Sequence, residues 1–216
     1  MLIPTRFNGP PGSANGGWSA GLFATTLVGA GPAEVTLRRP PPLAVTLSVD
    51  GSIVRDPAGE AIAEVRPVDA FASEAVPPVD RSTAATAATG YPGFTEHPFP
   101  TCYVCGPDHP AGLRIFPGGL PDGRTAAPFT VPDDVSPATI WAALDCPGGW
   151  AVIGAGRPYV LGRIAAAVVA MPAPGEECVV VGRLNAAEGR KAQVRTSLYG
   201  PAGALLGYAR ATWIAI

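Results

Sequence analysis

The apolar and polar positions of the first 69 residues predict one helix followed by strands. Apolar side chains recur at helical spacing over residues 13–28, where one face carries Trp18, Leu22, Phe23 and Leu27. Ser13 precedes this pattern and is the expected N-cap. After the helix, Val, Leu and Thr alternate with polar residues in runs that predict strands over 33–39, 43–49, 52–55 and 61–67. Asp50-Gly51 and residues 56–59 are typical of the turns between them.

Residues 101–216 show the same order of elements. Strands are predicted over residues 113–116 and 125–129, and a helix begins at Ser136. Ser136 is a good N-cap, and Pro137 occupies the first helical position, where its missing N–H costs nothing. The last strands are predicted over residues 159–170, 177–185, 191–199 and 204–216, with a Gly-Pro-Ala-Gly turn before the final one.

The two blocks read as copies of one plan. The start of the first helix at Asn15 corresponds to the start of the second at Ser136. The Pro-Ala-Gly turn that begins at Pro57 likewise corresponds to the one that begins at Pro201. Residues 70–100 lie between the blocks, contain five prolines and show no sustained period, so they are predicted to be a linker or an extended strap. The prediction is an α+β fold in which an antiparallel sheet wraps a helix, built twice: an N-terminal half 1–69, the segment 70–100 and a C-terminal half 101–216.

Composition narrows the class of protein. The chain has 216 residues, 47% of them apolar and only 15% charged, and its formal net charge is −2. This balance excludes disorder for most of the chain, and no basic stripe indicates binding to nucleic acid. Residues 1–13 do not resemble a secretory signal, and Arg157 and Arg163 interrupt the longest apolar stretch, residues 151–171. We therefore expect no membrane span and a cytoplasmic location.

Motifs in both halves resemble the hotdog-fold thioesterases. Members of that family carry an Asn, then His-Gly-Gly opening the central helix, then a carboxylate nine residues after the His. Here the first half runs from Asn8 to Asn15-Gly16-Gly17, with Asn in place of His, one extra loop residue, and Ala24 at the carboxylate position. The second half is complementary, because Asp145 lies nine residues after Ser136 although the Gly-Gly is absent. Its Cys-x-x-Cys-Gly…Gly-Leu opening, residues 102–113, is also similar to that of many bacterial members.

The resemblance implies a double hotdog that hydrolyses acyl-CoA or acyl-carrier thioesters. In dimers of the family, one subunit supplies the Asn and a glycine N–H, and the other supplies the carboxylate. Here Asp145 would be the base or nucleophile and the Gly16 N–H the oxyanion donor, while Asn8 or Asn15 would hold a water molecule. A second site, related by the repeat, would pair the helix start at Ser136 with position 24. Pro137 has no N–H to donate there and Ala24 has no carboxylate, so each chain would have one competent site.

Coenzyme A enters this interpretation as part of the substrate, and no other cofactor is expected. Arg190 and Lys191, or else Arg38 and Arg39, could meet its phosphates, although such residues are more often plain surface charges. A homodimer is left open.

Other functions stay open beside hydrolysis. The missing His and Ala24 also fit a pseudoenzyme that binds acyl-CoA or an acyl chain without hydrolysing it. A hydratase on the same fold would need a His near the carboxylate, and the sequence shows none there. Gly16-Gly17 could serve helix packing alone, and Asp145 could be a solvated helix residue.

The cysteines raise the question of a metal site. Cys102, Cys105, His97 and His109 have ligand-type side chains, but they fall within thirteen positions among prolines, so a closed tetrahedral site is awkward. We therefore expect Cys102 and Cys105 to be reduced and to carry no metal.

Overall fold

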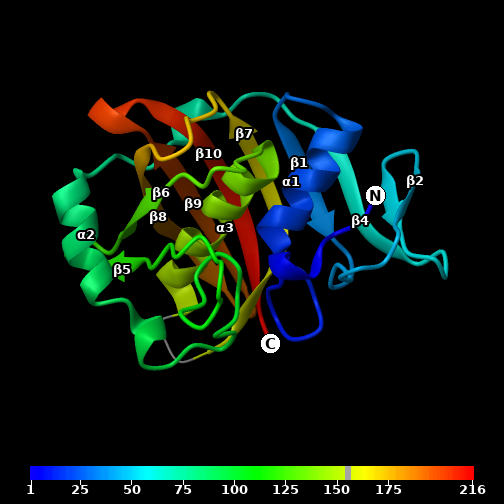
Figure 1. The fold of residues 1–216 in the computed structure, drawn as a ribbon, viewed down its shortest axis with the longest axis horizontal. Helices are drawn as coiled ribbons and strands as arrows, with labels where there is room; N and C mark the ends of the chain where they lie inside the picture. The colour runs from blue at the N-terminus through cyan, green and yellow to red at the C-terminus, as the bar shows by residue number, and fades with distance from the viewer. Residues whose placement is uncertain (154–156) are drawn as a thin grey trace.

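A single antiparallel sheet of ten strands organises the computed structural model, which describes residues 1–153 and 157–216. The strand order is β2-β3-β4-β1-β7-β10-β9-β8-β6-β5, and most of it can be followed in Figure 1. The strands are β1 (Ala33–Leu37), β2 (Ser48–Asp50), β3 (Ile53–Arg55), β4 (Ala61–Pro67), β5 (Gly118–Gly119), β6 (Thr125–Thr130), β7 (Tyr159–Val168), β8 (Glu177–Glu188), β9 (Lys191–Tyr199) and β10 (Leu205–Ala215).

The two predicted halves join at one pair of strands. β1, from the N-terminal half, pairs antiparallel with β7, from the C-terminal half, and aligns Ala33 with Ala166 and Val35 with Ile164. Strands β2, β3 and β4 extend the sheet beyond β1, and the remaining five strands extend it beyond β7. The predicted α+β class, with two helices on one continuous antiparallel sheet, is therefore confirmed.

Two helices cover one face of the sheet and form the core between the halves. α1 (Gly16–Leu27) and α3 (Pro137–Ile153) lie side by side in front of the strands (Figure 1). Gly17 faces Asp145 while Gly21 faces Ala138, so the helices run antiparallel. Buried side chains of both halves, among them Phe23 and Ile140, belong to one hydrophobic cluster. The packing of α3 therefore decides what lies against the start of α1.

Residues 71–89 cross the opposite face of the sheet, whereas Tyr91 and His97 pack against Trp150 of α3. Phe71 packs edge-on against Tyr208 of β10, with ring centroids 4.7 Å apart, and the backbone of Val76 bonds the side chains of Ser197 and Tyr199. A helix, α2 (Arg81–Thr89), then packs against β6. The segment is thus a strap, and it contains a helix that the sequence pattern did not predict. Four 3₁₀ turns complete the elements: Thr5–Phe7, Ala72–Glu74, Pro92–Phe94 and Pro201–Gly203.

The strap explains why β8 is apolar on both faces. Cys178 and Val180 point toward the cluster that contains α1 and α3, whereas Val179 and Val181 belong to a second cluster with Val76. Successive side chains of a strand point to opposite faces, so a continuous apolar run is expected where both faces are covered.

Three predictions about local structure are corrected, two by backbone conformation and one by side-chain hydrogen bonds. Of the predicted strand 43–49, only residues 48 and 49 belong to β2, and Ala44 adopts a left-handed conformation with φ 57°. Arg114 does the same with φ 55°, and residues 113–116 form no strand. The N-cap of α1 is Asn15, whose side chain accepts a hydrogen bond from Trp18 N–H at 2.8 Å, whereas the Ser13 hydroxyl donates to the Pro10 carbonyl. Among the described residues, none of the helices has the length and apolar character to span a membrane.

Close contact between α3 and β8 gives the first testable prediction. A Cβ atom on Gly182 would lie 2.3 Å from the carbonyl oxygen of Pro147, so Gly182→Ala should push helix and strand apart. We expect the free energy of unfolding, measured by urea denaturation, to fall by about 1–3 kcal/mol. Gly119→Ala, where a Cβ meets nothing within 4 Å, is the control and should change it by less than about 0.5 kcal/mol. Equal stability of the two variants would contradict the tight packing.

Candidate active site

The N-terminus of α1 is held in place by its capping residue. Asn15 is buried, its Oδ1 accepts from Trp18 N–H, and its backbone carbonyl accepts from the Ser19 hydroxyl at 2.8 Å. Its Nδ2 points away from the helix and lies 3.4 Å from Oδ2 of Asp145. The side chain therefore joins the start of α1 to α3.

Asp145 is the single charged residue of α3, and it is buried with 2% of its surface exposed. Its Oδ2 accepts a hydrogen bond from the backbone N–H of Gly17 at 2.9 Å. Burial raises the pKa of Asp145 to about 7, although the hydrogen bonds from Gly17 and Asn15 act in the opposite direction. Oδ1 has no hydrogen-bond partner among the residues that the structure describes. One oxygen is therefore anchored, and the other is buried without a partner among the described residues.

The two glycines of α1 have different surroundings. A Cβ atom on Gly17 would lie 2.4 Å from Cβ of Asp145 and 2.9 Å from the carbonyl oxygen of Trp141, so only glycine allows this approach of the helices. Gly16 instead faces Leu161 of β7 and lines a cavity. Its N–H is one of the first amides of α1, which have no acceptor within the helix. The sequence named the Gly16 N–H as the oxyanion donor, and in the structure the N–H that bonds Asp145 is that of Gly17.

A largely apolar cavity of about 400 Å³ adjoins these groups. Its walls come from the start of α1, from α3, and from the start of β7 and the end of β10. They include Trp150, Leu161 and Trp213. Asn15, Gly16 and Asp145 all line it. This volume and character are typical of a small-molecule site with a few polar groups in an apolar wall.

Other predicted site residues lie apart from the cavity. The Asn8 side chain donates to the carbonyl and hydroxyl oxygens of Thr101, at 2.6 and 3.1 Å, and does not line the cavity. Arg190 and Lys191 do not line it either, and Nε of Arg190 donates to the carbonyl of Ala215.

The second pair of predicted cations does line the cavity. Arg38 and Arg39 are exposed at its edge, where they form ion pairs with Glu64 at 2.6 Å and Glu60 at 2.5 Å. These are the cations through which an anionic part of a ligand could be held.

The equivalent position at the other end of the helix pair, where α3 begins beside Ala24 of α1, lacks the pairing of a glycine N–H with a carboxylate. Ser136 bonds Thr139 as the cap of α3, Pro137 follows, and Ala24 is buried with 2% exposure. None of the four residues lines the cavity.

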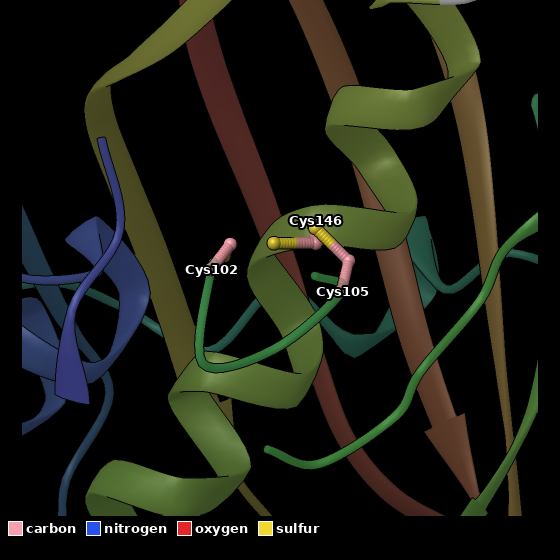
Figure 2. A group of neighbouring side chains, drawn as sticks. All are labelled: Cys102, Cys105 and Cys146. Carbon is pink, nitrogen blue, oxygen red and sulfur yellow. The ribbon is translucent and has the colours of Figure 1, made fainter. Parts of the chain in front are cut away.

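Sequence reasoning did not single out Cys146, which also lines this cavity. Cys146 follows Asp145 on α3, and its sulfur lies with those of Cys102 and Cys105, all within 4.8 Å of one another (Figure 2). His97 also lines the cavity, but its Nδ1 accepts from Phe99 N–H at 2.9 Å and its Nε2 lies 3.2 Å from the Cys105 carbonyl oxygen. Both ring nitrogens are therefore engaged. The position of Cys146 directly after the carboxylate was the available signal.

No family model matches the sequence, and no curated protein is significantly similar to it. Solved structures are similar over nearly the whole chain. A candidate thioesterase from Novosphingobium aromaticivorans DSM 12444 is 17% identical, with TM-score 0.64 over 99% of this chain and 92% of that one. A candidate oleoyl thioesterase from Lactobacillus plantarum is 11% identical, with TM-score 0.58 over 100% and 94%. A protein of unknown function with a hotdog fold from Alicyclobacillus acidocaldarius is 11% identical, with TM-score 0.54 over 99% and 91%. The chain has the hotdog fold.

Contact between Gly17 and Asp145 gives the second prediction. Gly17→Ala places a methyl group on the Asp145 side chain and on the α3 backbone, and it should lower the free energy of unfolding by about 1–3 kcal/mol. Chemical denaturation measures this change. Gly31→Ala is the matched control, because the nearest atom to its Cβ is 4.0 Å away. A Gly17→Ala protein as stable as the control would show that α1 and α3 are not held this closely.

Proposed function

We propose that this hotdog-fold chain hydrolyses acyl thioesters and that Asp145 is the base or nucleophile. One observation carries the proposal: a buried carboxylate lies at the N-terminus of α1, on the wall of an apolar cavity, with one oxygen bonded and one free. Burying a carboxylate without a cation is unfavourable, so a structural role alone does not explain it. The similarity to candidate thioesterases adds support from the fold.

The chemistry uses the free oxygen of Asp145. As a base, it takes a proton from water while the water oxygen bonds to the thioester carbonyl carbon. The tetrahedral intermediate then expels the thiolate, which receives the proton from Asp145, and the C–S bond breaks. As a nucleophile, the carboxylate bonds to the same carbon, the C–S bond breaks and the thiolate leaves, taking a proton from solvent. Water then hydrolyses the resulting anhydride, which releases the carboxylic acid and restores the Asp145 carboxylate. Either route needs the carbonyl carbon close to Oδ1.

The carbonyl oxygen becomes negative in this step and needs a donor. Gly16 N–H is suited to that role, because it lies at the positive end of α1 and its residue lines the cavity. Gly17 N–H is already used by Asp145. Asn15 keeps the two parts in register through its bonds to Trp18 and Asp145.

The site is proposed to be single in each chain. The N-terminal half contributes the helix start and the C-terminal half contributes the carboxylate. At the pseudo-symmetric position, Pro137 has no N–H to donate and Ala24 has no carboxylate. The active site therefore depends on both halves being joined in one sheet.

The substrate is proposed to be an acyl thioester of coenzyme A or of an acyl-carrier group. Trp150, Leu161 and Trp213 give the acyl chain an apolar wall. Arg38 and Arg39 at the edge of the cavity are better placed for phosphate groups than Arg190 and Lys191, which do not line it. A chain that binds acyl-CoA and never hydrolyses it would instead be the pseudoenzyme.

The third prediction tests Asp145. Asp145→Asn keeps the shape of the side chain and an acceptor for Gly17 N–H, so the protein should fold, but it removes the base. We expect kcat for acyl-CoA hydrolysis, followed by release of free thiol, to fall by about 10²–10⁴-fold. Asp133→Asn, at an exposed carboxylate, is the control and should leave kcat unchanged. A fully active Asp145→Asn enzyme would refute the mechanism, and a parent that binds acyl-CoA without turnover would establish the pseudoenzyme.

The fourth prediction tests the phosphate contacts. Arg38 and Arg39 form exposed ion pairs, so replacing both with Ala should leave the free energy of unfolding almost unchanged. A charge-assisted hydrogen bond to phosphate contributes about 1.5–3 kcal/mol, so KM for acyl-CoA should rise at least about tenfold. KM for the same acyl group on N-acetylcysteamine, which has no phosphate, should not change. Lys191→Ala is the control, and an equal rise in KM for both substrates would contradict this assignment.

A further inference from the structure

Three of the four cysteines form a cluster that the proposed hydrolysis does not use. The Sγ atoms of Cys102, Cys105 and Cys146 all lie within 4.8 Å of one another, and each residue is buried with 3–4% exposure. Figure 2 shows that two of them come from one loop and the third from α3. The cluster therefore links segments 41 positions apart in the sequence. We propose that these three thiolates bind one zinc ion.

The geometry of the sulfurs suits zinc. Zn–S bonds of about 2.3 Å at tetrahedral angles place the sulfur atoms ~3.8 Å apart, so only a small contraction of the observed triangle is needed. The Cys-x-x-Cys spacing of Cys102 and Cys105 is one of the common ligand spacings of structural zinc sites. Thiolate ligands favour zinc over magnesium or calcium, which prefer oxygen.

The loop that carries two of the ligands is rigidly held by its backbone. Gly106 N–H donates to the Cys102 carbonyl at 2.8 Å, which closes the turn. Tyr103 N–H donates to the Asn8 carbonyl at 2.8 Å, and Ile115 N–H donates to the Val104 carbonyl at 3.0 Å. A site whose ligands are positioned before the metal arrives loses less conformational freedom on binding.

Polar groups around the sulfurs provide a second shell. Nδ2 of Asn15 lies 3.8 Å from Sγ of Cys102 and 4.0 Å from Sγ of Cys146. Donors of this kind orient thiolate ligands and reduce their excess negative charge.

His97 acts in this second shell rather than as a ligand. Its Nδ1 accepts from Phe99 N–H, so the proton of the neutral ring is on Nε2. Nε2 lies 3.5 Å from Sγ of Cys105 and donates toward it and the adjacent carbonyl. The fourth zinc position therefore faces the cavity, which all three cysteines line, and is filled by water. The sequence argument against metal counted the two histidines and omitted Cys146.

The zinc ion would fasten the 102–105 loop to α3, one residue from Asp145. Binding replaces the thiol protons, which are released to solvent, and no oxidation or reduction takes place. The inference does not depend on the proposed hydrolysis, since a pseudoenzyme would bind zinc equally well.

Metal analysis of the full chain, purified under reducing conditions without chelator, tests the inference. We expect about one zinc per chain. After exchange with Co²⁺ alone, the protein should show the thiolate-to-cobalt charge-transfer band and the visible bands of tetrahedral cobalt. Cys146→Ala should lose both metals, whereas Cys178→Ala, at a buried cysteine of β8 outside the cluster, should keep them. Asp145→Asn should also keep them, even though it loses hydrolysis.

Titration of the reduced parent with Co²⁺ needs no variant and keeps the test valid if Cys146→Ala fails to fold. The parent should take up one Co²⁺ more tightly than micromolar, and removal of the metal by chelator should lower Tm. The inference is overturned if the reduced parent shows no charge-transfer band, if a folded Cys146→Ala binds metal like the parent, or if mass spectrometry finds the cluster as a metal-free disulfide.

Discussion

The hydrogen bond from Gly17 N–H to Asp145 is the contact on which the site depends. It requires α1 and α3 to approach so closely that a Cβ on Gly17 would lie 2.4 Å from Cβ of Asp145. That approach places a carboxylate beside the positive end of a helix, where its hydrogen bonds from Gly17 and Asn15 offset part of the rise in pKa that burial causes. It also leaves the neighbouring Gly16 N–H on the cavity wall. Any larger residue at position 17 would separate the acid from the donor.

The two predicted halves contribute different parts to the proposed site. Pairing of β1 with β7 joins them in one sheet and sets their central helices against each other. In the proposed site, the N-terminal half supplies the glycines and the C-terminal half supplies the carboxylate. The unused helix start is closed by Pro137 and the unused acid position by Ala24, which is buried. Asymmetry of this kind is available to one joined chain and not to two identical subunits.

Much of the fold could be predicted from the sequence, because alternating strands and capped helices leave local patterns. The range 61–67 agrees with β4, and 191–199 agrees with β9. The helix α2 was missed because its Ala- and Thr-rich sequence lacks an apolar period, although Asp80 caps it through Thr83 N–H and Gly90 ends it. Ala44 and Arg114 ended predicted strands through a backbone conformation that the residue types do not indicate.

The site was harder to predict because its contacts join distant segments. Asp145 and the glycine pair could be identified by resemblance, but the bond to Gly17 rather than Gly16 depends on the rotation of two helices. Asn8 bonds Thr101, which is 93 positions away in the sequence, and does not line the cavity. The clustering of Cys146 with Cys102 and Cys105 depends on how the loop packs against α3, which no spacing in the sequence reveals.

A crystal structure of the Asp145→Asn protein with an intact acyl-CoA tests the central claim most directly. The account predicts that the acyl chain occupies the cavity beside Trp150 and Trp213. It also predicts that the thioester oxygen lies about 2.7–3.1 Å from the Gly16 nitrogen, with the carbonyl carbon facing position 145. A thioester bound away from the start of α1, or an acyl chain outside this cavity, would contradict it.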